Sequence, residues 1–377
     1  MRLVIAPDSF KGSLTALEAA RAMEAGVRRV FPASEIQMFP MADGGEGTLD
    51  AVLYAARGER RTLTVSGAAG EQVEAAYGVI RDERGDIAVI ESAQVVGLTL
   101  VGASDVAQRG TVGLGELLRH CLDAGLRHFM IGLGGSSTND GGTGVLAALG
   151  VRLLDAHGEP VAPTPSGLAK LFHIDFSALD TRILQADITL MTDVDNPLCG
   201  AAGATATFGP QKGVAPSDVM LFDARLANLA RLCDAWLGRE LSHEAGTGAA
   251  GGLGYAFMLL GAKRRPGAEV VCELMRLDAA MQGADWALTG EGRSDAQTLH
   301  GKLPLAVSRH ARRRRVPVTL LSGRIDAAAR AALEAHFDGC FEAAPEALPL
   351  AQAMREAAQW LTGAAERAAR VFSARQG

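Results

Sequence analysis

Residues 129–144, with the sequence FMIGLGGSSTNDGGTG, are the stretch from which the rest of the chain is interpreted. An apolar run ends in glycines and hydroxyl residues and then enters the helical pattern VLAALG. A strand that ends in glycines before a helix start directs backbone N–H groups at one place, which suits an anion and most often a phosphate. The glycines allow close approach, and the hydroxyls add donors. We predict a phosphate-binding loop made by Gly134, Gly135, Ser136, Ser137 and Thr138. The alternative is a glycine-rich turn that only links strand to helix, which explains the glycines better than the hydroxyls.

Length and composition predict a two-domain globular protein. The 377 residues exceed the roughly 250 to 300 at which single cores stop growing, so we expect two domains. Hydrophobic residues make up 48% and charged residues 21%, as in a soluble globular enzyme. No apolar run approaches the ~18 residues of a membrane span and no signal peptide is recognisable, which predicts a cytoplasmic protein without a membrane partner. The net charge of −6 argues against a nucleic-acid partner.

Cysteine and histidine spacing gives no metal motif. The 5 cysteines form no CxxC pair and the 8 histidines no HExxH, which favours reduced thiols over disulfides or zinc ligands.

Lysine is rare among the 37 cations, yet Lys11, Lys212 and Lys302 each adjoin a glycine in a loop-like motif. A flexible ammonium can follow a moving phosphoryl group. We therefore interpret Lys11 and Lys302 as phosphate or carboxylate ligands, against the alternative of ordinary surface lysines.

Strand, loop and helix alternate at both ends of the chain. Residues 2–6 read as a buried strand, and Thr15 with Glu18 forms a capping box before an apolar helical stripe. A second such unit follows, and the same rhythm returns near Asp285. This predicts an α/β fold with a doubly wound, Rossmann- or flavodoxin-like parallel sheet whose ligands gather at the carboxyl ends of the strands.

The middle of the chain has a different rhythm. From about residue 60 the segments look like strands joined by turns, so a second α/β domain is predicted as an insertion. The expected division is 1–60 with 285–377 for the first domain and 61–284 for the second, with the active site in the cleft between them. Within the insertion, Ser217 is expected to cap a helix that ends at Leu237 before Gly238. Its expected apolar side contains Leu221, Leu229, Leu232 and Trp236.

Acidic residues inside glycine-containing loops form a second set of candidates. They are Asp43, Glu46, Asp193, Asp195, Glu291 and Asp295. Phosphoryl transfer uses Mg²⁺ bound to one or two carboxylates, and a further carboxylate that takes the proton of the acceptor hydroxyl. Each residue alone is also explained as a helix cap or turn aspartate. All of them follow predicted strands, however, where residues of a ligand-binding crevice are expected.

Two familiar nucleotide motifs are absent or out of place. No GxxxxGKS or GxxxxGKT occurs, and the HRD and DFG kinase signatures are missing. The string GTGAAG at 246–251 matches GxGxxG, but it follows a helix and a polar segment instead of a strand. A hinge or a nucleotide-facing loop is the better interpretation. A nicotinamide oxidoreductase would rest on this string alone.

Taken together, the motifs resemble those of the bacterial glycerate kinases of the first type. They are APDSFKGSLTA, MADGGEGT, GLGGSSTNDGGTG, DVDNPLCG, FGPQKG, GTGAAGGLG and TGEGRSDAQTLHGK, in the order and spacing of that family over the whole chain. The resemblance implies ATP-dependent phosphorylation of D-glycerate, usually at the 2-hydroxyl, with Mg²⁺ and a two-domain α/β fold. Ser137, Ser294 and Arg324 depart from the family pattern, and Arg324 leaves the contacts of its loop open.

Roles can be assigned as hypotheses. The 134–138 loop and the 246–254 loop, including Gly251 and Gly252, would hold ATP phosphates, while Lys11 and Lys302 neutralise the transferred phosphoryl group or the glycerate carboxylate. Asp193 would be the base. Mg²⁺ would be held by Asp43, Asp195 and Glu291, and the substrate by Asp8, Ser9, Asn139, Asp140 and Arg293.

Some alternatives stay open at this stage. A kinase for another small hydroxy acid, or one that forms 3-phosphoglycerate, would use the same residue types. A regulatory protein that senses an anionic metabolite is less consistent with so many loop carboxylates, because a sensor of anions gains nothing from them. The sequence also leaves the oligomeric state open, a homo-oligomer included.

Overall fold

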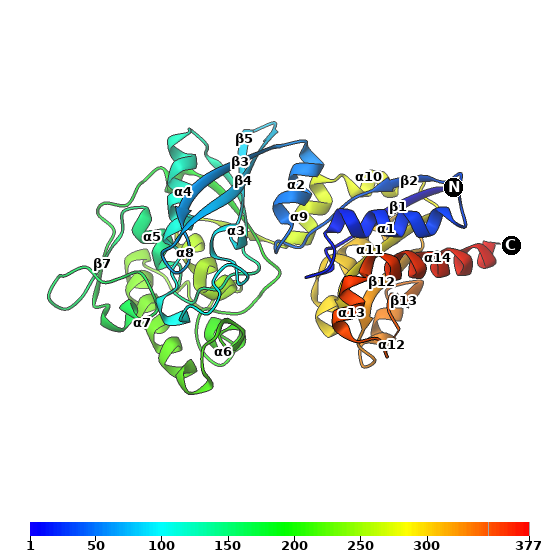
Figure 1. Cartoon of the computed structure of the whole chain (residues 1–377). Coiled ribbons are helices and arrows are strands. Elements are labelled where there is room, and N and C mark those ends of the chain that lie inside the picture. Colours follow the sequence, from blue (N-terminus) through cyan, green and yellow to red (C-terminus); the bar gives the residue numbers. More distant parts are fainter. Residues whose placement is uncertain (346, 377) are drawn as a thin grey trace. The chain divides into compact units, whose positions relative to one another are not determined.

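The computed structural model describes residues 1–345 and 347–376. The chain has an α/β fold and divides into two compact units, coloured along the chain in Figure 1. Unit 1 comprises Met1–Asp43, Asp50–Ala56 and Pro266–Gly377, and unit 2 comprises Gly44–Leu49 and Arg57–Arg265.

The chain joins unit 1 again at Pro266, earlier than the predicted position 285. The short helices α9 (Gly267–Leu274) and α10 (Leu277–Met281) are attached to α11 (Leu303–Arg313) by the buried ring of His310. Its Nδ1 lies 2.7 Å from Asp278 Oδ1 and its Nε2 lies 3.0 Å from Glu269 Oε2. These long-range side-chain contacts explain why residues 266–284 belong to unit 1, and no local sequence pattern signals them.

Unit 1 is built on a parallel sheet of order β13-β12-β11-β1-β2. Its strands are β1 (Arg2–Pro7), β2 (Glu35–Met38), β11 (Trp286–Ser294), β12 (Val318–Ile325) and β13 (Gly339–Glu342). From β1 the chain adds β2 on one side, and on its return it adds β11, β12 and β13 on the other side. The direction of growth therefore reverses between β1 and β11, and at such a point the loops beyond the carboxyl ends of the strands diverge and leave room for a ligand.

Helices of unit 1 connect and cover this sheet. Besides α9, α10 and α11 they are α1 (Ala16–Arg28), α2 (Thr48–Ala56), η7 (Ala296–His300), α12 (Arg330–Glu334), α13 (Leu350–Arg355) and α14 (Ala357–Gln376). The start of α1 confirms the predicted capping box, because Glu18 N donates to Thr15 Oγ1 and Thr15 N donates to Glu18 Oε2. α2 begins in the short segment assigned to unit 2 and continues in unit 1.

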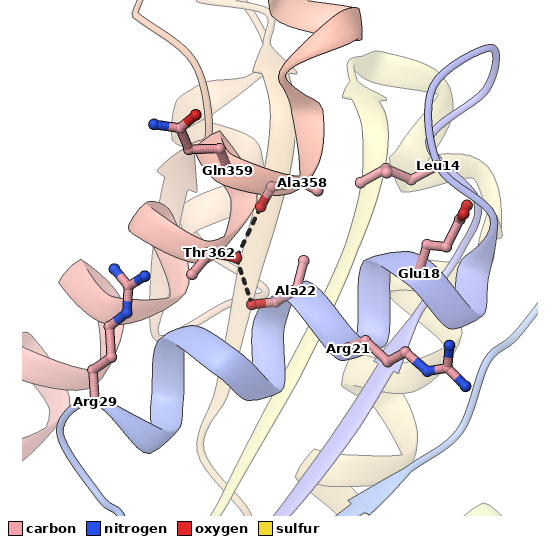
Figure 2. A pocket seen from close by; sticks show the side chains of 8 residues that line it. All are labelled: Leu14, Glu18, Arg21, Ala22, Arg29, Ala358, Gln359 and Thr362. Atoms are coloured by element: carbon pink, nitrogen blue, oxygen red, sulfur yellow. Dashed lines mark hydrogen bonds between the residues drawn. The ribbon is translucent and has the colours of Figure 1, made fainter.

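The first and last helices of the chain pack closely against each other (Figure 1). A Cβ at Gly26 of α1 would lie 2.2 Å from the carbonyl oxygen of Thr362 in α14, so only glycine fits there. Figure 2 shows how Thr362 Oγ1 reaches Ala22 O at 3.1 Å and Ala358 O at 2.8 Å. Charged side chains such as Arg21 and Arg29 border the open groove beside this contact. The buried part of unit 1 lies between these helices and the sheet, around Trp286 and Met23.

Unit 2 contains a mixed sheet of order β10-β9-β6-β5-β4-β3, in which β4 pairs antiparallel with β3 and β5 and the other pairs are parallel. Its strands are β3 (Glu59–Ser66), β4 (Gln72–Asp82), β5 (Gly85–Glu91), β6 (His128–Gly132), β9 (Asp187–Met191) and β10 (Lys263–Arg265). A separate antiparallel ribbon pairs β7 (Arg152–Leu154) with β8 (His173–Asp175). The predicted strand at 129–133 is therefore a central strand, β6.

Short helices and one long helix complete unit 2. They are α3 (Ala93–Val96), η1 (Val106–Gln108), α4 (Val112–Asp123), α5 (Thr143–Ala148), η2 (Gly167–Lys170), η3 (Ile183–Gln185), α6 (Ala204–Phe208), η4 (Pro210–Lys212), η5 (Pro216–Asp218), α7 (Val219–Leu237), η6 (Ala249–Gly252) and α8 (Leu253–Leu259). A large apolar core joins them to the sheet.

The long helix α7 differs from its prediction in detail. It ends at Leu237 before Gly238, as predicted, but Ser217 lies in a preceding 3₁₀ turn and does not cap it. Leu221 and Trp236 were placed on the wrong face, because their exposed fractions are 51% and 45%. Trp236 covers Phe176 from outside, with stacked rings 4.0 Å apart. Within the described residues, no helix is long and apolar enough to cross a membrane.

Candidate active site

The carboxyl ends of β1 and β11 bring two acidic residues together in unit 1. The two strands pair in parallel from Leu3 with Trp286 to Pro7 with Gly290, and Asp8 N then donates to Gly290 O at 2.8 Å. Asp8 and Glu291 therefore leave the sheet side by side. This is the point where the direction of sheet growth reverses, so a ligand site is expected here.

A pocket of about 460 Å³ opens at this point, and we call it the unit 1 pocket. Its volume lies within the range of small-molecule sites. Its polar side is lined by Asp8, Ser9, Lys11, Ser13, Asp43, Glu291, Arg293, Asp295, Lys302 and Arg324. Its apolar side is lined by Phe10, Ala343, Ala344, Leu350, Ala353, Met354, Ala357 and Trp360. The structure thus gathers seven of the predicted site residues in one place, namely Asp8, Ser9, Lys11, Asp43, Glu291, Arg293 and Lys302.

The loop after β1 is held in a tight turn. Phe10 and Leu14 exchange both backbone hydrogen bonds, and Ser13 Oγ donates to Phe10 O at 2.8 Å. Gly12 has a φ of +75°, a left-handed conformation that glycine adopts without strain. This turn buries Phe10 and leaves Lys11 exposed at its tip, where an ammonium can reach an anionic ligand.

Glu291 is buried and fixed through one of its two oxygens. Its Oε1 accepts hydrogen bonds from Ser294 Oγ at 2.8 Å and from Thr298 Oγ1 at 2.6 Å. Burial raises the pKa of Glu291, and the bonds from Thr298 and Ser294 and the charge of Lys302 act in the opposite direction. The two hydroxyl groups therefore orient the carboxyl group, and a nearby positive charge lowers its pKa.

Asp8 belongs to the same crowded set of carboxyl groups. Its pKa lies well above the ordinary value because it is buried and because Asp43 and Glu291 lie nearby; Ser9 N, which donates to its Oδ1 at 2.6 Å, lowers the pKa. A bound cation would relieve this mutual repulsion. Carboxylate oxygens are the ligands that Mg²⁺ prefers, and it commonly takes one or two of them together with substrate phosphates. The donor set of the unit 1 pocket therefore fits Mg²⁺ held through Asp43 and Glu291.

Among the residues that the structure describes, no group of three or more His, Cys, Asp or Glu side chains is arranged to hold a metal ion. The third predicted ligand, Asp195, lies in unit 2, where its exposed carboxylate forms an ion pair with Arg264. Asp193 lies in unit 2 as well, in the segment that follows β9.

The predicted phosphate loop, residues 134–144, also lies in unit 2, and we call it the glycine loop. A Cβ at Gly134 would lie 2.4 Å from the Cα of Gly45, and Gly134 N donates to Gly44 O at 3.0 Å. Similarly, a Cβ at Gly251 would lie 2.0 Å from Thr138 O. These glycines are required because stretches of the chain approach one another closely, which the sequence analysis attributed to a ligand.

Asp140 satisfies the N–H groups at the start of α5. Its Oδ2 accepts from Thr111 N at 3.0 Å, Thr111 Oγ1 at 2.7 Å and Gly144 N at 3.2 Å, and its Oδ1 accepts from Gly142 N at 3.1 Å. The side chain is fully buried, which raises its pKa. The anion at this helix start is therefore the chain's own carboxylate.

Hydroxyl and amide groups of the glycine loop are engaged in a similar way. Ser137 Oγ donates to Val96 O at 2.8 Å, and Asn139 Nδ2 donates to Thr205 Oγ1 at 2.9 Å. Ser136, Ser137, Thr138 and Asn139 are all buried. The hydroxyls of Ser136 and Ser137 have partners within unit 2, whereas the buried Thr138 Oγ1 and Asn139 Oδ1 have no hydrogen-bond partner among the residues that the structure describes. The predicted roles of all four residues as ligands therefore stay predictions.

Lys212 is a residue whose position the sequence analysis missed. In the sequence, this lysine is recognisable only as one that adjoins a glycine, and no role was predicted for it. Lys212 Nζ donates to Ser136 Oγ at 3.0 Å and to Thr138 O at 2.8 Å, and desolvation lowers its pKa to about 7. Arg109 Nη1 donates to Lys212 O at 2.8 Å and holds the same segment. The one feature of the sequence that could have drawn attention to Lys212 is the rarity of lysine in this chain.

Comparisons with known proteins agree with the architecture. The family model described as "Glycerate kinase family" matches residues 3–373. A glycerate kinase of Halalkalibacterium halodurans is 42% identical over 98% of both chains, and a glycerate 2-kinase of Escherichia coli is 40% identical over 86% of both. A crystal structure of a candidate glycerate kinase 2 from Salmonella typhimurium LT2 is 40% identical, with a TM-score of 0.82 over 100% of this chain and 99% of that one. The chain therefore belongs to the glycerate kinase family, and it is an enzyme of the kinase class.

Proposed function

We propose that the chain transfers the γ-phosphoryl group of ATP to the 2-hydroxyl of D-glycerate and releases ADP and 2-phosphoglycerate. The hydroxyl oxygen bonds to the γ-phosphorus, the bond from that phosphorus to the β–γ bridging oxygen breaks, and the hydroxyl proton leaves to a base. Full-length similarity to glycerate kinases supports the reaction, and the name of the E. coli relative, a glycerate 2-kinase, supports the position of transfer.

One observation carries the proposal: the unit 1 pocket combines cationic and acidic groups beyond β1 and β11. Lys11, Lys302 and Arg293 lie along its polar side with Asp43 and Glu291. Ammonium and guanidinium groups neutralise the charge of phosphates and of a substrate carboxylate. Carboxylates beside them would repel both substrates, unless they hold Mg²⁺. A site for a simple anion would not place these acidic groups here.

Each group has a proposed task. Mg²⁺, when bound with ATP, neutralises charge on the phosphate oxygens and aligns them for transfer. Asp43 and Glu291 would hold it, and Ser294 and Thr298 keep the Glu291 carboxylate in position. Lys11 and Lys302 would accompany the transferred group, while Arg293 would bind the glycerate carboxylate. Arg293 is suited to this because its side chain is 69% exposed and lies no closer than 3.8 Å to Asp326 and 4.0 Å to Asp295 in its ion pairs.

In unit 2, Asp193 is the proposed base, and the loops at 134–138 and 246–254 are the proposed ligands of ATP phosphates. The support for Asp193 is its place just after the parallel strand β9.

A direct assay tests the proposal. ADP release is measured with ATP, Mg²⁺ and D-glycerate, and the product is identified by ³¹P NMR. We expect glycerate-dependent ADP and 2-phosphoglycerate. A product that is 3-phosphoglycerate would overturn the position of transfer but leave the kinase. No ADP above the glycerate-free control, from protein shown to be folded, would overturn the choice of acceptor, and a panel of other small hydroxy acids would follow.

A further inference from the structure

The unit 1 pocket has an apolar side that the proposed acceptor does not need. Phe10, Met354 and Trp360 form this side together with Ala343, Ala344 and Leu350. Every carbon of glycerate carries an oxygen atom, so glycerate has no apolar surface to bury. The polar side of the pocket alone would satisfy it. The apolar side must therefore serve another ligand or another surface.

Size leads to the same conclusion. The pocket has a volume of about 460 Å³, which is much more than a three-carbon acid fills. Sites of this volume commonly hold ligands of the size of a cofactor and combine apolar walls with a few polar groups. Of the two substrates in the proposed reaction, only ATP carries a large planar group with an apolar face.

We propose that the apolar side of the unit 1 pocket, with Phe10, Met354 and Trp360, binds the adenine ring of ATP, while Lys11 and Lys302 bind its phosphates. This inference rests on the proposed function for its choice of nucleotide. The thioether of a methionine and the face of an indole both make favourable contacts with a planar ring. A single ligand would then span both sides of the pocket.

The apolar side is held in place from two directions. Trp360 Nε1 donates to Glu356 Oε2 at 3.2 Å, which fixes the indole so that its ring, not its N–H group, is available. Arg324 Nη2 donates to Leu348 O at 3.2 Å and anchors the segment that leads into α13. Arg324 is one of the three residues that depart from the family pattern, and it lines the polar side of the pocket while it holds this segment.

Met354 joins the two sides. A Cβ at Gly12 would lie 2.8 Å from the Cε of Met354, so this methionine packs over the turn that carries Lys11. A larger side chain at position 12 would displace the methionine as well as strain the turn. Met354, which is assigned to the adenine ring, thus packs against the turn that carries Lys11, which is assigned to the phosphates.

Equilibrium binding without glycerate tests the inference. The probes are ADP and inorganic tripolyphosphate, measured by calorimetry on the full chain in the presence of Mg²⁺. We expect Met354→Gln to weaken ADP binding about threefold to tenfold, because an uncharged polar amide replaces the apolar contact with the adenine ring. Tripolyphosphate, which has no base, should bind as it does to the unchanged protein. Arg21→Ala, in the groove between α1 and α14, is the control and should leave both affinities unchanged.

A second variant keeps the test valid if Met354→Gln fails to fold, as judged by circular dichroism. Trp360→Leu keeps an apolar side chain but removes the aromatic face, and it should weaken ADP binding by about threefold to tenfold. Unchanged ADP affinity in a folded variant would overturn the inference, as would an equal loss for ADP and tripolyphosphate. So would a change from oligomer to monomer without a change in ADP affinity, which would mean that a second copy covers the apolar side. If ADP binds as expected but glycerate is not phosphorylated, the proposed function fails and the inference stands.

Discussion

The unit 1 pocket and the glycine loop of unit 2 look alike in the sequence and differ in the structure. Both place acidic and hydroxyl residues among glycines just after a strand. In the pocket, Lys11, Asp43 and Glu291 line an open space. In the glycine loop, Ser137 and Asp140 bond to other parts of the chain and are fully buried. The same sequence pattern thus lines an open pocket in one place, and in the other it places Ser137 and Asp140 in internal packing.

This comparison shows what distinguishes the two cases physically. Burial and the nearby carboxyl groups of Asp43 and Glu291 raise the pKa of Asp8 more than Ser9 N and Lys11 lower it, and a bound cation would relieve this repulsion. Asp140 is also buried, but N–H and hydroxyl donors surround its carboxylate. These donors belong to the protein itself, and their hydrogen bonds lower the pKa of Asp140, which burial raises. The two buried carboxyl groups therefore differ in the hydrogen-bond donors around them more than in their sequence motifs.

Asp193 gives the strongest test, because a catalytic base there would show that unit 2 also supplies a catalytic group, from outside the glycine loop. If it takes the hydroxyl proton, Asp193→Asn should lower kcat by about 10² to 10⁴, as is usual for a lost general base. Steady-state kinetics with ATP and D-glycerate measure this. A decrease of less than about tenfold would remove Asp193 from that role and leave the chemistry to the residues of the unit 1 pocket.

Glu291 should show the next largest effect. Glu291→Gln keeps the shape and the bonds from Ser294 and Thr298 but removes a charge from the proposed Mg²⁺ site, so kcat should fall by about 10². The Mg²⁺ concentration needed for half-maximal rate should rise as well. Glu334→Gln on α12, where the carboxylate is exposed and only 3.8 Å from Arg330, is the matched control and should change neither. An unchanged requirement for Mg²⁺ would contradict the ligand role.

The same substitution at Asp8 and Asp140 should change stability in opposite directions. Asp8 has a raised pKa in the folded protein, so its folded state is favoured at low pH and loses that advantage as the pH rises through the folded pKa. At pH 7 the charge is unfavourable, and Asp8→Asn should raise the free energy of unfolding. Below the ordinary carboxyl pKa of about 3.9, variant and wild type should converge.

Asp140→Asn should instead lower the free energy of unfolding by about 1 to 3 kcal/mol, because its amide NH₂ would face a buried donor in either orientation. Urea unfolding at pH 7 compares both variants with wild type. Destabilisation by Asp8→Asn would show that the hydrogen bond from Ser9 N and the charge of Lys11 outweigh the repulsion at Asp8, and the comparison would lose its basis.

Lys212 should give the smallest effect. Because its pKa is lowered to about 7 by desolvation, the folded state binds fewer protons than the unfolded state above that pH. The free energy of unfolding of wild type relative to Lys212→Met should therefore rise between pH 7 and 9, by at most ~1.4 kcal/mol per pH unit. Lys170→Met, at an exposed lysine, should run parallel to wild type. A pH-independent difference for Lys212→Met would mean that Lys212 stays charged inside unit 2.

Local signals in the sequence predicted local structure well. The capping box of Thr15 and Glu18 is present, α7 ends before Gly238, and alternating strands and helices form a parallel sheet in unit 1. The predictions were wrong where contacts between residues distant in the sequence determine the structure. Trp236 is exposed because Phe176 offers it an outer surface, and residues 266–284 join unit 1 through His310.

The candidate site shows the same limit. Lys11, Asp43 and Glu291 were recognisable because they follow strands that share a sheet. The apolar side of the pocket was not, since Met354 and Trp360 lie in the C-terminal helices, far from any motif. Lys212 likewise depends on a contact with Ser136 across 76 positions of sequence.

The pairing of β1 with β11 has a consequence for how the chain folds during synthesis. Thr289 donates to the carbonyl of Ala6 across 283 positions of sequence, so β1 has no partner on that side until nearly the whole chain is made. At roughly 5 to 20 residues per second, the ribosome takes about 15 to 60 s to cover that distance. Unit 2 is completed first, and the N-terminal segment waits beside it with an unpaired strand edge, the state in which a nascent chain most needs a chaperone.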